Sequence, residues 1–303
     1  MLDIKRIICA VDFSEFSERA LEHAVTIARW YDAAVTVLHV VDMRVETPVG
    51  APLAPIALAP VPLTIAARNQ AGVQLQQLVE TVATTGVRVE TVVVDGRPDT
   101  SILELAETMP ADLLVMGTHG RSGFDRLVMG SVTEKVLRKA RCPVLSLPPH
   151  SRERAQTPVT LKSALCPVDF SESSMKALQC AAFLAEEADA HLTVLHVARP
   201  LASAEATVYG RLDLPEAQLK YEGDLARRLA DFVPVAARAY CTVEEQVTTG
   251  KPWREILRVA GERRVELIVI GVRGRTSTDM TLFGSTTHHV VRQATCPVLT
   301  IRS

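Results

Sequence analysis

Aromatic residues and paired cysteines are scarce in this chain. Phe, Trp and Tyr make up 4% of its 303 residues, and none of the six cysteines is spaced Cys-x-x-Cys. The common zinc motifs are therefore excluded, and six cysteines in a chain of this length do not make a disulfide-rich scaffold. Cys9 and Cys166 lie inside apolar runs, and Cys142 and Cys296 just before others. We expect most of these cysteines to be small core residues.

The chain also lacks an excess of positive charge and a long apolar run. Its formal net charge is −2 and its pI is about 6.5, whereas a nucleic-acid-binding face needs clustered Lys and Arg. Residues 1–6 lack the apolar core of a signal peptide, and no later segment is apolar enough to cross a bilayer. We therefore expect a cytoplasmic soluble protein with no nucleic-acid partner and no membrane partner.

Several catalytic motifs are absent as well. Gly250-Lys251-Pro252 lacks both the first glycine and the hydroxyl residue of a Walker A loop. No Gly-x-Ser-x-Gly turn marks a hydrolase nucleophile, and no Cys/His pair has a third, orienting residue. His288 and His289 would point to different helix faces, so they do not predict a shared metal. We assign no catalytic residue and no metal ligand.

What the chain does have is the glycine pattern Gly-x2-Gly-x9-Gly-Ser. It occurs twice at an offset of 154 residues, at Gly117, Gly120, Gly130 and Ser131 and again at Gly271, Gly274, Gly284 and Ser285. Each copy follows an apolar run, 113–116 or 267–270, and leads into a segment with helical spacing. Glycine leaves backbone N–H groups unobstructed, and a helix start attracts anions. Both loops are therefore candidate phosphate sites.

The repetition covers the whole chain. Residues 8–15 match 165–172 at an offset of 157 residues, and 142–145 match 296–299 at 154. A period this long indicates a duplicated domain rather than a solenoid repeat. We predict two domains, 1–148 and 159–303, which are related by an internal pseudo-two-fold axis. A polar segment bounded by prolines joins them.

Each half alternates strands and helices. In the first half the expected strands are 7–11, 35–41, 87–94, 113–116 and 144–147. They are continuous Val, Ile and Leu runs, which is typical of parallel strands covered on both faces. The pattern predicts an α/β fold with a doubly wound parallel sheet in each domain, and ligand loops at the carboxyl edge of that sheet. Residues 43–65 carry five prolines, which predicts that no regular helix forms there.

Helix capping is an alternative reading of the glycine loops. Ser131-x-x-Glu134 has the form of a capping box, so the first loop could serve only to begin a helix. The second copy, Ser285-x-x-His288, lacks the acidic partner but keeps every glycine, so capping alone does not explain the repeat. Arg121 and Arg275 also match each other, and both a phosphate contact and a plain surface charge remain open for them.

A matched pair of acids follows the first strand of each half. Asp12 and Asp169 each stand between a strand and a helix. A carboxylate in this place can accept hydrogen bonds from a ribose hydroxyl or an exocyclic amine. The alternative is local helix capping, although Ser14 alone could supply the cap.

Two further matched pairs belong to the second strand of each half. Val40 and Val197 stand where that strand ends, so their backbone could pair with the edge of a base. His39 and His196 precede them inside the strands, and we expect both to be core histidines with satisfied hydrogen bonds.

These motifs together resemble the universal stress protein family. The resemblance rests on 117–123, Gly130-Ser131, 142–145, 11–15 and 38–40, and it extends over nearly all of both halves. It implies a five-stranded parallel sheet in each domain and pairing of the last strands, 144–147 with 298–301. It also implies ATP binding in members that keep the glycine pattern. Ser277 replaces the first copy's Gly123, which puts the affinity of the second loop in doubt.

The resemblance assigns the ligand contacts residue by residue. In the first half they are Asp12, Val40, Met116, Gly117, Gly120, Gly130, Ser131 and Val132, beside the candidate Arg121. In the second half they are Asp169, Val197, Ile270, Gly271, Gly274, Gly284, Ser285 and Thr286, beside the candidate Arg275.

The function we expect is ligand-dependent regulation of a stress response without fast catalysis. The ligand would be ATP, or else ADP or AMP, with Mg²⁺ accompanying the phosphates. A protein partner and a homodimer are both compatible with this hypothesis. Two alternatives remain open: a slow ATP hydrolase or adenylating enzyme, and a dimerising scaffold whose loops bind no nucleotide. The loop after the first strand lacks the Ser-Gly-Gly-x-Asp-Ser form that adenylating enzymes need.

Overall fold

The computed structural model of this chain describes residues 4–42, 61–82, 84–119, 129–149, 161–200, 214–272 and 283–302. The chain divides into two compact units, an N-terminal unit of residues 3–149 and a C-terminal unit of residues 150–303. Across the described ranges, no helix is both long enough and apolar enough to span a membrane.

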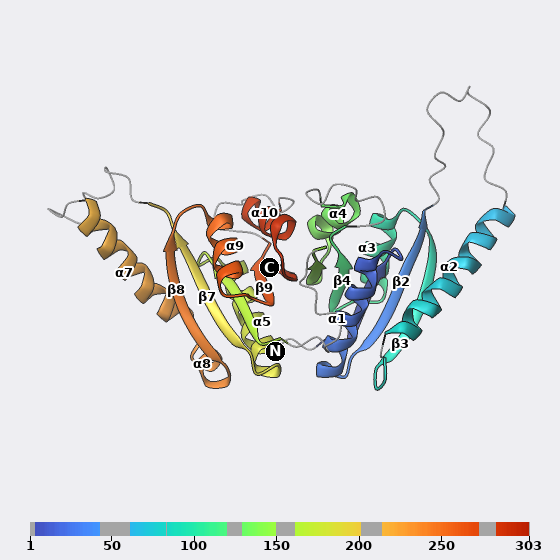
Figure 1. Cartoon of the computed structure of the whole chain (residues 1–303), viewed down its shortest axis with the longest axis horizontal. Helices are drawn as coiled ribbons and strands as arrows, with labels where there is room; N and C mark the ends of the chain where they lie inside the picture. The colour runs from blue at the N-terminus through green and yellow to red at the C-terminus, as the bar shows by residue number, and fades with distance from the viewer. Residues whose placement is uncertain are drawn as a thin grey trace, which may run out of the picture. The chain divides into compact units, whose positions relative to one another are not determined.

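The N-terminal unit alternates strands and helices (Figure 1). Its elements are β1 (Arg6–Val11), α1 (Glu15–Tyr31), β2 (Ala34–Asp42), α2 (Val61–Thr81), β3 (Arg88–Gly96), α3 (Pro98–Thr108), β4 (Leu113–Gly117), α4 (Ser131–Lys139) and β5 (Val144–Leu147). The strands lie in the order β3-β2-β1-β4-β5, and all of these neighbours are parallel. This is the predicted doubly wound sheet of five parallel strands.

The C-terminal unit has the same architecture. Its elements are β6 (Ser163–Val168), α5 (Glu172–Glu187), β7 (His191–Ala198), α7 (Leu214–Phe232), α8 (Val235–Tyr240), β8 (Thr242–Thr249), α9 (Pro252–Glu262), β9 (Leu267–Gly271), α10 (Ser285–Gln293) and β10 (Val298–Ile301). The order is β10-β9-β6-β7-β8, again parallel throughout. The short helix α8 has no counterpart among the described elements of the N-terminal unit.

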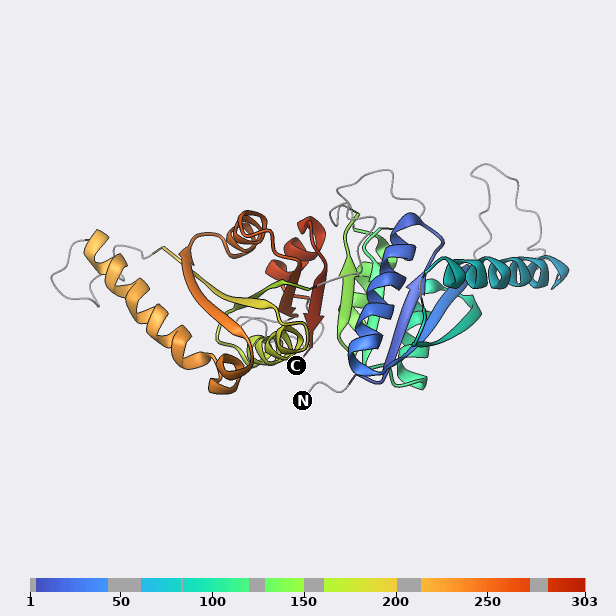
Figure 2. The ribbon, with the colours of Figure 1, turned by 60° about the horizontal axis from the view of Figure 1, so that its bottom comes forward.

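Apolar side chains fill the space between each sheet and its helices. Leu21 of α1 and Leu114 of β4 are fully buried in the N-terminal unit, as are Leu178 of α5 and Leu192 of β7 in the C-terminal unit. Burial of one such side chain stabilises the fold by about 1.5–3 kcal/mol. Right-handed crossovers place α1 and α2 on one face of the sheet. After β3 the chain runs across the sheet in the opposite direction, so α3 and α4 cover the other face, where they contact each other (Figure 2).

One expectation about the N-terminal unit is wrong. The proline-rich segment 43–65 was predicted to hold no regular helix, yet α2 begins at Val61. Pro62 is the second residue of that helix. In a first turn the N–H group that proline lacks has no intrahelical acceptor, so the ring costs no helical hydrogen bond. Proline density thus identified the segment but misplaced its end.

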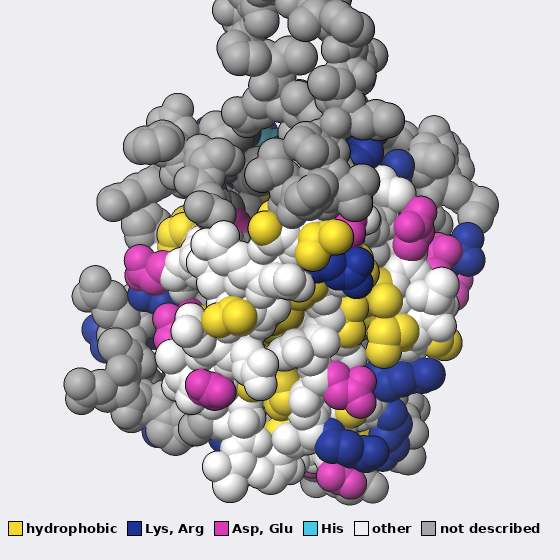
Figure 3. Space-filling model, turned by 90° about the vertical axis from the view of Figure 1, so that its right-hand side faces the viewer, with side chains coloured by type: hydrophobic (Ala, Val, Ile, Leu, Met, Phe, Trp, Pro, Cys, Tyr) yellow, Lys and Arg dark blue, Asp and Glu magenta, His cyan; other side chains and the backbone are white. Residues whose placement is uncertain are grey.

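Helix α2 leaves part of its surface open to solvent. Ile65 and Val73 are 54% and 58% exposed, whereas Ala71 and Leu75 are buried against the sheet. Figure 3 faces this side of the N-terminal unit, where hydrophobic side chains are interspersed with charged ones. The exposed residues therefore need no partner to explain them.

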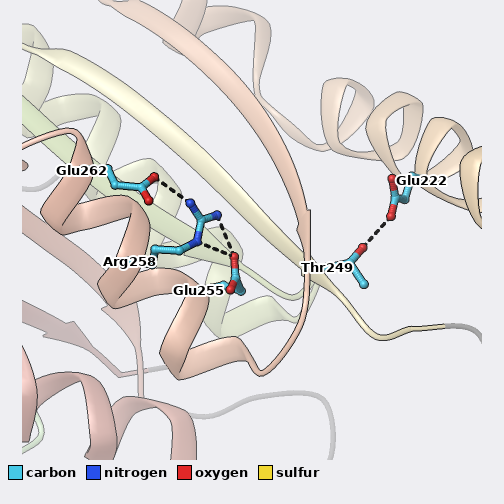
Figure 4. A network of polar contacts seen from close by, with 5 residues as sticks. All are labelled: Glu222, Thr249, Glu255, Arg258 and Glu262. Atoms are coloured by element: carbon cyan, nitrogen blue, oxygen red, sulfur yellow. Dashed lines mark hydrogen bonds and ion pairs between the residues drawn. The ribbon is translucent and has the colours of Figure 1, made fainter.

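Polar contacts tie the outer elements of the C-terminal unit together (Figure 4). Thr249, at the end of β8, donates to Glu222 Oε1 of α7 at 2.6 Å. This bond, and a second one from Gln218, lower the pKa of the Glu222 carboxyl. On α9, Arg258 donates to both Glu255 and Glu262. The Thr249 bond fixes α7 against the carboxyl end of β8, whereas the Arg258 bonds stay within α9.

Candidate functional site

The carboxyl ends of β1, β2 and β4 bring the sequence-predicted residues of the first half to one edge of the sheet. Val11 is in register with His39, and Ala10 with Met116. The residues that come next, Asp12, Val40 and Gly117, therefore lie side by side at the edge. This is the switch point of a doubly wound sheet, where such folds bind their ligands.

Helix α4 begins against the same edge. The Gly130 N–H donates to the Thr118 carbonyl oxygen at 2.8 Å, and the Thr133 hydroxyl donates to the Gly117 carbonyl oxygen at 2.9 Å. The two bonds hold the first turn of α4, with Ser131 and Val132, next to the end of β4. The N–H groups of this turn, which have no acceptor within the helix, thus face the carboxyl edge.

The capping-box reading of this turn is wrong. Helix α4 has Gly130, not Ser131, as its N-cap residue, and no side chain caps it. Glu134 pairs with Arg138 at 2.7 Å instead of reaching back to the helix start. Since a glycine N-cap has no side chain that could accept from the first N–H groups, it leaves them able to bind an anion.

The C-terminal unit repeats this arrangement. Gly284 N–H donates to the Val272 carbonyl oxygen at 3.0 Å, and the Thr287 hydroxyl donates to the Gly271 carbonyl oxygen at 2.8 Å. The N-cap of α10 is Gly284, again without a side-chain cap. Two helix starts of the same geometry therefore exist, one in each unit.

Close packing explains glycine at these positions. A Cβ on Gly117 would lie 3.2 Å from the His119 carbonyl oxygen and from Phe16 Cβ, and one on Gly130 would lie 3.2 Å from the Thr118 oxygen. A Cβ on Gly284 would lie 2.9 Å from the Val272 oxygen. None of the three positions has a positive φ, so it is the short distances that favour glycine there.

Asp12 is held in a small network at the start of α1. Its Oδ1 accepts from the Ser14 N–H at 3.1 Å, the Ser14 hydroxyl at 2.6 Å and the Ser17 hydroxyl at 2.5 Å. Ser14 is the N-cap residue of α1, but its side chain makes no cap bond. The capping alternative is therefore right about the position of Ser14 but wrong about its side chain, which donates to Asp12 instead of capping the helix.

The residue after each of these acids is a phenylalanine in the left-handed region. Phe13 has φ 62° and Phe170 has φ 63°. Their rings pack on His39 and His196, with centroids 4.2 and 4.4 Å apart. A non-glycine residue in this conformation is uncommon, and here the packing of the ring compensates for its cost.

His39 and His196 both have the hydrogen bonds that the sequence predicts, but only His196 is buried in the core, whereas His39 is half-buried. Nδ1 of His39 lies 2.9 Å from the Val11 carbonyl oxygen, and Nδ1 of His196 lies 2.8 Å from that of Val168. Each ring thereby links the second strand of its unit to the end of the first. In the C-terminal unit Arg228 also lies over the Phe170 ring, 4.1 Å from its centroid.

Most of the remaining predicted residues are placed where the sequence implied. Val197 lies in β7, Ile270 in β9 and Thr286 in the first turn of α10, as Ser285 does. Asp169 follows β6 and accepts from the Ser171 N–H at 3.1 Å. Gly120, Arg121, Gly274 and Arg275 lie outside the described residues, as do Gly123 and Ser277.

Sequence reasoning missed the two threonines that anchor the helix starts. Thr133 and Thr287 match at the offset of 154 residues and are both buried. The sequence does contain a signal for them, because each threonine stands three residues after the last glycine of its pattern. It was overlooked since a threonine in a helix has no obvious ligand role.

Within the described ranges, no three His, Cys, Asp or Glu side chains are grouped closely enough to hold an ion. What both sites do present is a row of backbone donors beside a carboxylate acceptor. That combination suits a ligand with an anionic tail and a hydrogen-bonding head.

Comparisons with known proteins agree with the duplicated architecture. The pattern of the universal stress protein family matches residues 3–148 and, a second time, residues 160–302. A universal stress protein of Methanocaldococcus jannaschii is 38% identical over 142 residues, which cover 46% of this chain and 80% of that protein. One of Bacillus subtilis is 35% identical over 145 residues, covering 46% and 97%. The crystal structure of a universal stress protein from Archaeoglobus fulgidus shares the fold, with TM-score 0.71 and 21% identity over 100% of this chain and 98% of the other.

Proposed function

This chain belongs to the universal stress protein family, and from that premise we propose that each unit binds an adenine nucleotide, ATP first among them. Binding would change the shape of the protein or its choice of partner during a stress response. The observation that carries the proposal is the pair of uncapped helix starts at Gly130 and Gly284, each tied to the end of a central strand.

The phosphates would lie at these helix starts. In the N-terminal unit the N–H groups of Ser131 and Val132 would donate to them, and the helix dipole would add about 0.3–1 kcal/mol. Each hydrogen bond to a charged oxygen contributes about 1.5–3 kcal/mol. Ser285 and Thr286 would do the same in the C-terminal unit. Gly120, Arg121, Gly274 and Arg275 are further proposed contacts from the sequence pattern.

The nucleoside would lie over the neighbouring strand ends. Asp12 and Asp169 would accept hydrogen bonds from the ribose or the base, and the backbone of Val40 and Val197 would line the pocket. Met116 and Ile270 end their strands between these residues and the helix starts. Each acid follows one strand, and each helix start is tied to the neighbouring strand. The spacing of parallel strands, about 4.8 Å, therefore sets how far the acid lies from the helix start.

Magnesium would accompany the phosphates rather than occupy a site of its own. We propose this because the described residues hold no cluster of metal-binding side chains. The proposed role is binding without fast turnover, since Oδ1 of Asp12 is already engaged by three donors from the protein.

Two measurements on the purified protein test the proposal. Mass spectrometry of an acid extract should find an adenine nucleotide, and thermal unfolding should shift when Mg-ATP is added. At a hundredfold excess over Kd the gain is about 2.7 kcal/mol for each site, which corresponds to a rise in Tm of about 5–10 °C for a unit of this size. Absence of nucleotide in the extract together with an unchanged Tm would refute it.

A further inference from the structure

The two units contain the same short motif in two different hydrogen-bonded states. The motif reads Asp-Phe-Ser-Glu-x-Ser, at residues 12–17 and 169–174. In both copies the backbone N–H of the first serine donates to the aspartate Oδ1 at 3.1 Å. The copies differ in what the two serine hydroxyls do.

In the N-terminal unit both hydroxyls serve the carboxylate. Ser14 Oγ donates to Asp12 Oδ1 at 2.6 Å, and Ser17 Oγ donates to the same oxygen at 2.5 Å. Ser17 Oγ also accepts from the Asp12 N–H at 2.8 Å. The Ser17 side chain, which is 3% exposed, therefore holds Asp12 at both its backbone and its carboxylate.

In the C-terminal unit the same hydroxyls bond to the helix backbone where those of the N-terminal unit bond to the carboxylate. Ser171 Oγ accepts from the Ser174 N–H at 3.2 Å, which is a regular N-cap bond. Ser174 Oγ donates to the Ser171 carbonyl oxygen at 3.0 Å. It also accepts from the Asp169 N–H at 3.4 Å, a longer version of the 2.8 Å bond between the Asp12 N–H and Ser17. A hydroxyl has one proton, so that of Ser174 is directed at the helix backbone instead of at Asp169.

The packing of the helix start differs between the units as well. The residue between the serines is Phe16 in one copy and Ser173 in the other. A Cβ on Gly117 would lie 3.9 Å from the Phe16 carbonyl carbon, whereas a Cβ on Gly271 would lie 3.0 Å from that of Ser173. Helix α5 thus begins closer to its central strand than α1 does, which accompanies the different serine contacts.

We propose that Ser17 and Ser14 are positioning residues that fix Asp12 toward the nucleoside, and that the two nucleotide sites are therefore unequal. This rests on the proposed function. The site of the N-terminal unit holds its acceptor ready, because three donors converge on one oxygen of Asp12. In the C-terminal unit, orienting Asp169 in the same way requires Ser174 to break its bond to the Ser171 carbonyl.

The two sites should differ in how they bind the nucleoside and not in how they bind the phosphates. The helix starts at Gly130 and Gly284 have equivalent ties to their strands, at 2.8–3.0 Å. An acceptor that is already oriented costs less free energy on binding than one that must be rearranged. The N-terminal site should therefore bind ATP more tightly, while the two sites bind inorganic tripolyphosphate about equally.

Matched serine variants test the proposal in full-length chains with one site left. Gly284→Val blocks the second helix start, and Gly130→Val blocks the first. In the chain with Gly284→Val, Ser17→Ala should weaken ATP binding about fivefold to tenfold, the scale of one charge-assisted hydrogen bond. In the chain with Gly130→Val, Ser174→Ala should change it less than about twofold. Calorimetry measures both, with tripolyphosphate titrated as the second ligand.

The tripolyphosphate titrations separate positioning from a general loss of structure. Ser17→Ala should leave tripolyphosphate affinity unchanged, and Ser17→Thr, which restores a hydroxyl, should recover ATP affinity. If Ser17→Ala fails to fold, Ser14→Ala and its match Ser171→Ala decide, with the same expected contrast.

Equal losses of ATP affinity in the two units would overturn the inference, as would a parallel loss of tripolyphosphate affinity. An N-terminal site that binds ATP no more tightly than the C-terminal one would also overturn it. The failure of the proposed function looks different, because then the chains without serine changes would bind no ATP at all.

Discussion

Positions 99 and 135 of the N-terminal unit correspond to 253 and 289 of the C-terminal unit, at the offset of 154 residues. In the first unit Lys135 Nζ of α4 lies 3.3 Å from Asp99 Oδ2 of α3, an ion pair. In the second, the ring of His289 on α10 stacks on Trp253 of α9 with centroids 5.0 Å apart. The same two helices are thus joined by charge in one unit and by aromatic stacking in the other.

The bonds that shape the sites show the opposite behaviour. Thr133 and Thr287 make the same bond to the last carbonyl of the central strand, and Gly130 and Gly284 begin their helices in the same way. Where a position sets the backbone of the site, the duplication keeps its chemistry. Where it only joins two helices, several chemistries give the same packing, so the residues differ.

The largest expected difference between the units lies at the end of the central strand. Gly271→Ala should cost the C-terminal unit about 2–3 kcal/mol, because its Cβ would lie 3.0 Å from backbone atoms of Ser173. Gly117→Ala should cost the N-terminal unit about 1 kcal/mol, since its closest contacts are at 3.2 Å. Denaturant unfolding followed by hydrogen exchange assigns each loss to a unit. A larger loss from Gly117→Ala would contradict the comparison.

The next largest difference concerns the contacts that join the two helices in each unit, Lys135–Asp99 and His289–Trp253. Trp253→Ala removes the stacking ring and should destabilise the C-terminal unit by about 2 kcal/mol. Lys135→Met removes a half-exposed lysine from the nearly buried Asp99, which keeps Arg97 at 3.7 Å. It should cost about 0.5 kcal/mol, an effect that 1 M salt abolishes. Urea titrations at low and high salt measure both. A salt-dependent Trp253→Ala loss, or a salt-independent Lys135→Met loss, would show that the joints have been misassigned.

A third difference is the response to pH at another matched pair, His23 and Cys180. Burial lowers the pKa of His23 below its ordinary value of 6.5, and the bond to the Arg19 carbonyl only partly offsets this. The unfolded chain therefore binds the proton first, and the N-terminal unit loses stability as pH falls below 6.5. The slope is at most about 1.4 kcal/mol per pH unit.

At the matched position of the C-terminal unit, Cys180 has the opposite pH dependence. Burial raises the pKa of this thiol from 9.0 to about 12. The unfolded chain loses its proton first, so stability falls as pH rises above 9.0. His23→Cys should remove the acid loss from the N-terminal unit and enlarge its alkaline loss, to which the buried thiols of Cys9 and Cys142, also with raised pKa, already contribute. Unfolding free energies at pH 5, 7.5 and 10, resolved by hydrogen exchange, measure this, and an acid loss that persists in His23→Cys would disprove the assignment.

The smallest difference concerns the outer helices. Thr249→Val removes the 2.6 Å bond to Glu222 and should cost about 1 kcal/mol near neutral pH. Because the pKa of Glu222 is lowered, this loss should vanish as pH falls below 4.5. Arg68→Ala removes a 3.4 Å ion pair with Asp95 and should cost less than about 0.5 kcal/mol. The reverse order in urea unfolding would count against this account.

The fold could be predicted because its signals are local and repeated. Buried runs such as 113–116 mark parallel strands, and the repetition excludes chance. The start of α2 could not be placed, since proline density does not reveal that Pro62 stands in a first turn. The cap of α4 was also misread, because Ser131 and Glu134 fit a capping box in sequence while tertiary bonds begin the helix at Gly130.

The state of the serine hydroxyls was beyond sequence reasoning for a different reason. Ser17 and Ser174 are the same residue type at matched positions, and each can donate to a carboxylate or to a backbone carbonyl. The choice accompanies how closely the helix packs on its strand, which differs by 0.9 Å (3.9 against 3.0 Å) at the matched contacts of Gly117 and Gly271. Pattern and propensity do not carry that information.

Calorimetric titration of the full chain with ATP tests the central claim most directly, namely that bare backbone donors at two helix starts bind the phosphates. We predict two ATP per chain, one in each single variant Gly130→Val or Gly284→Val, and none in the double variant. Two ATP still bound by the double variant, or none bound by the unaltered chain, would contradict the account.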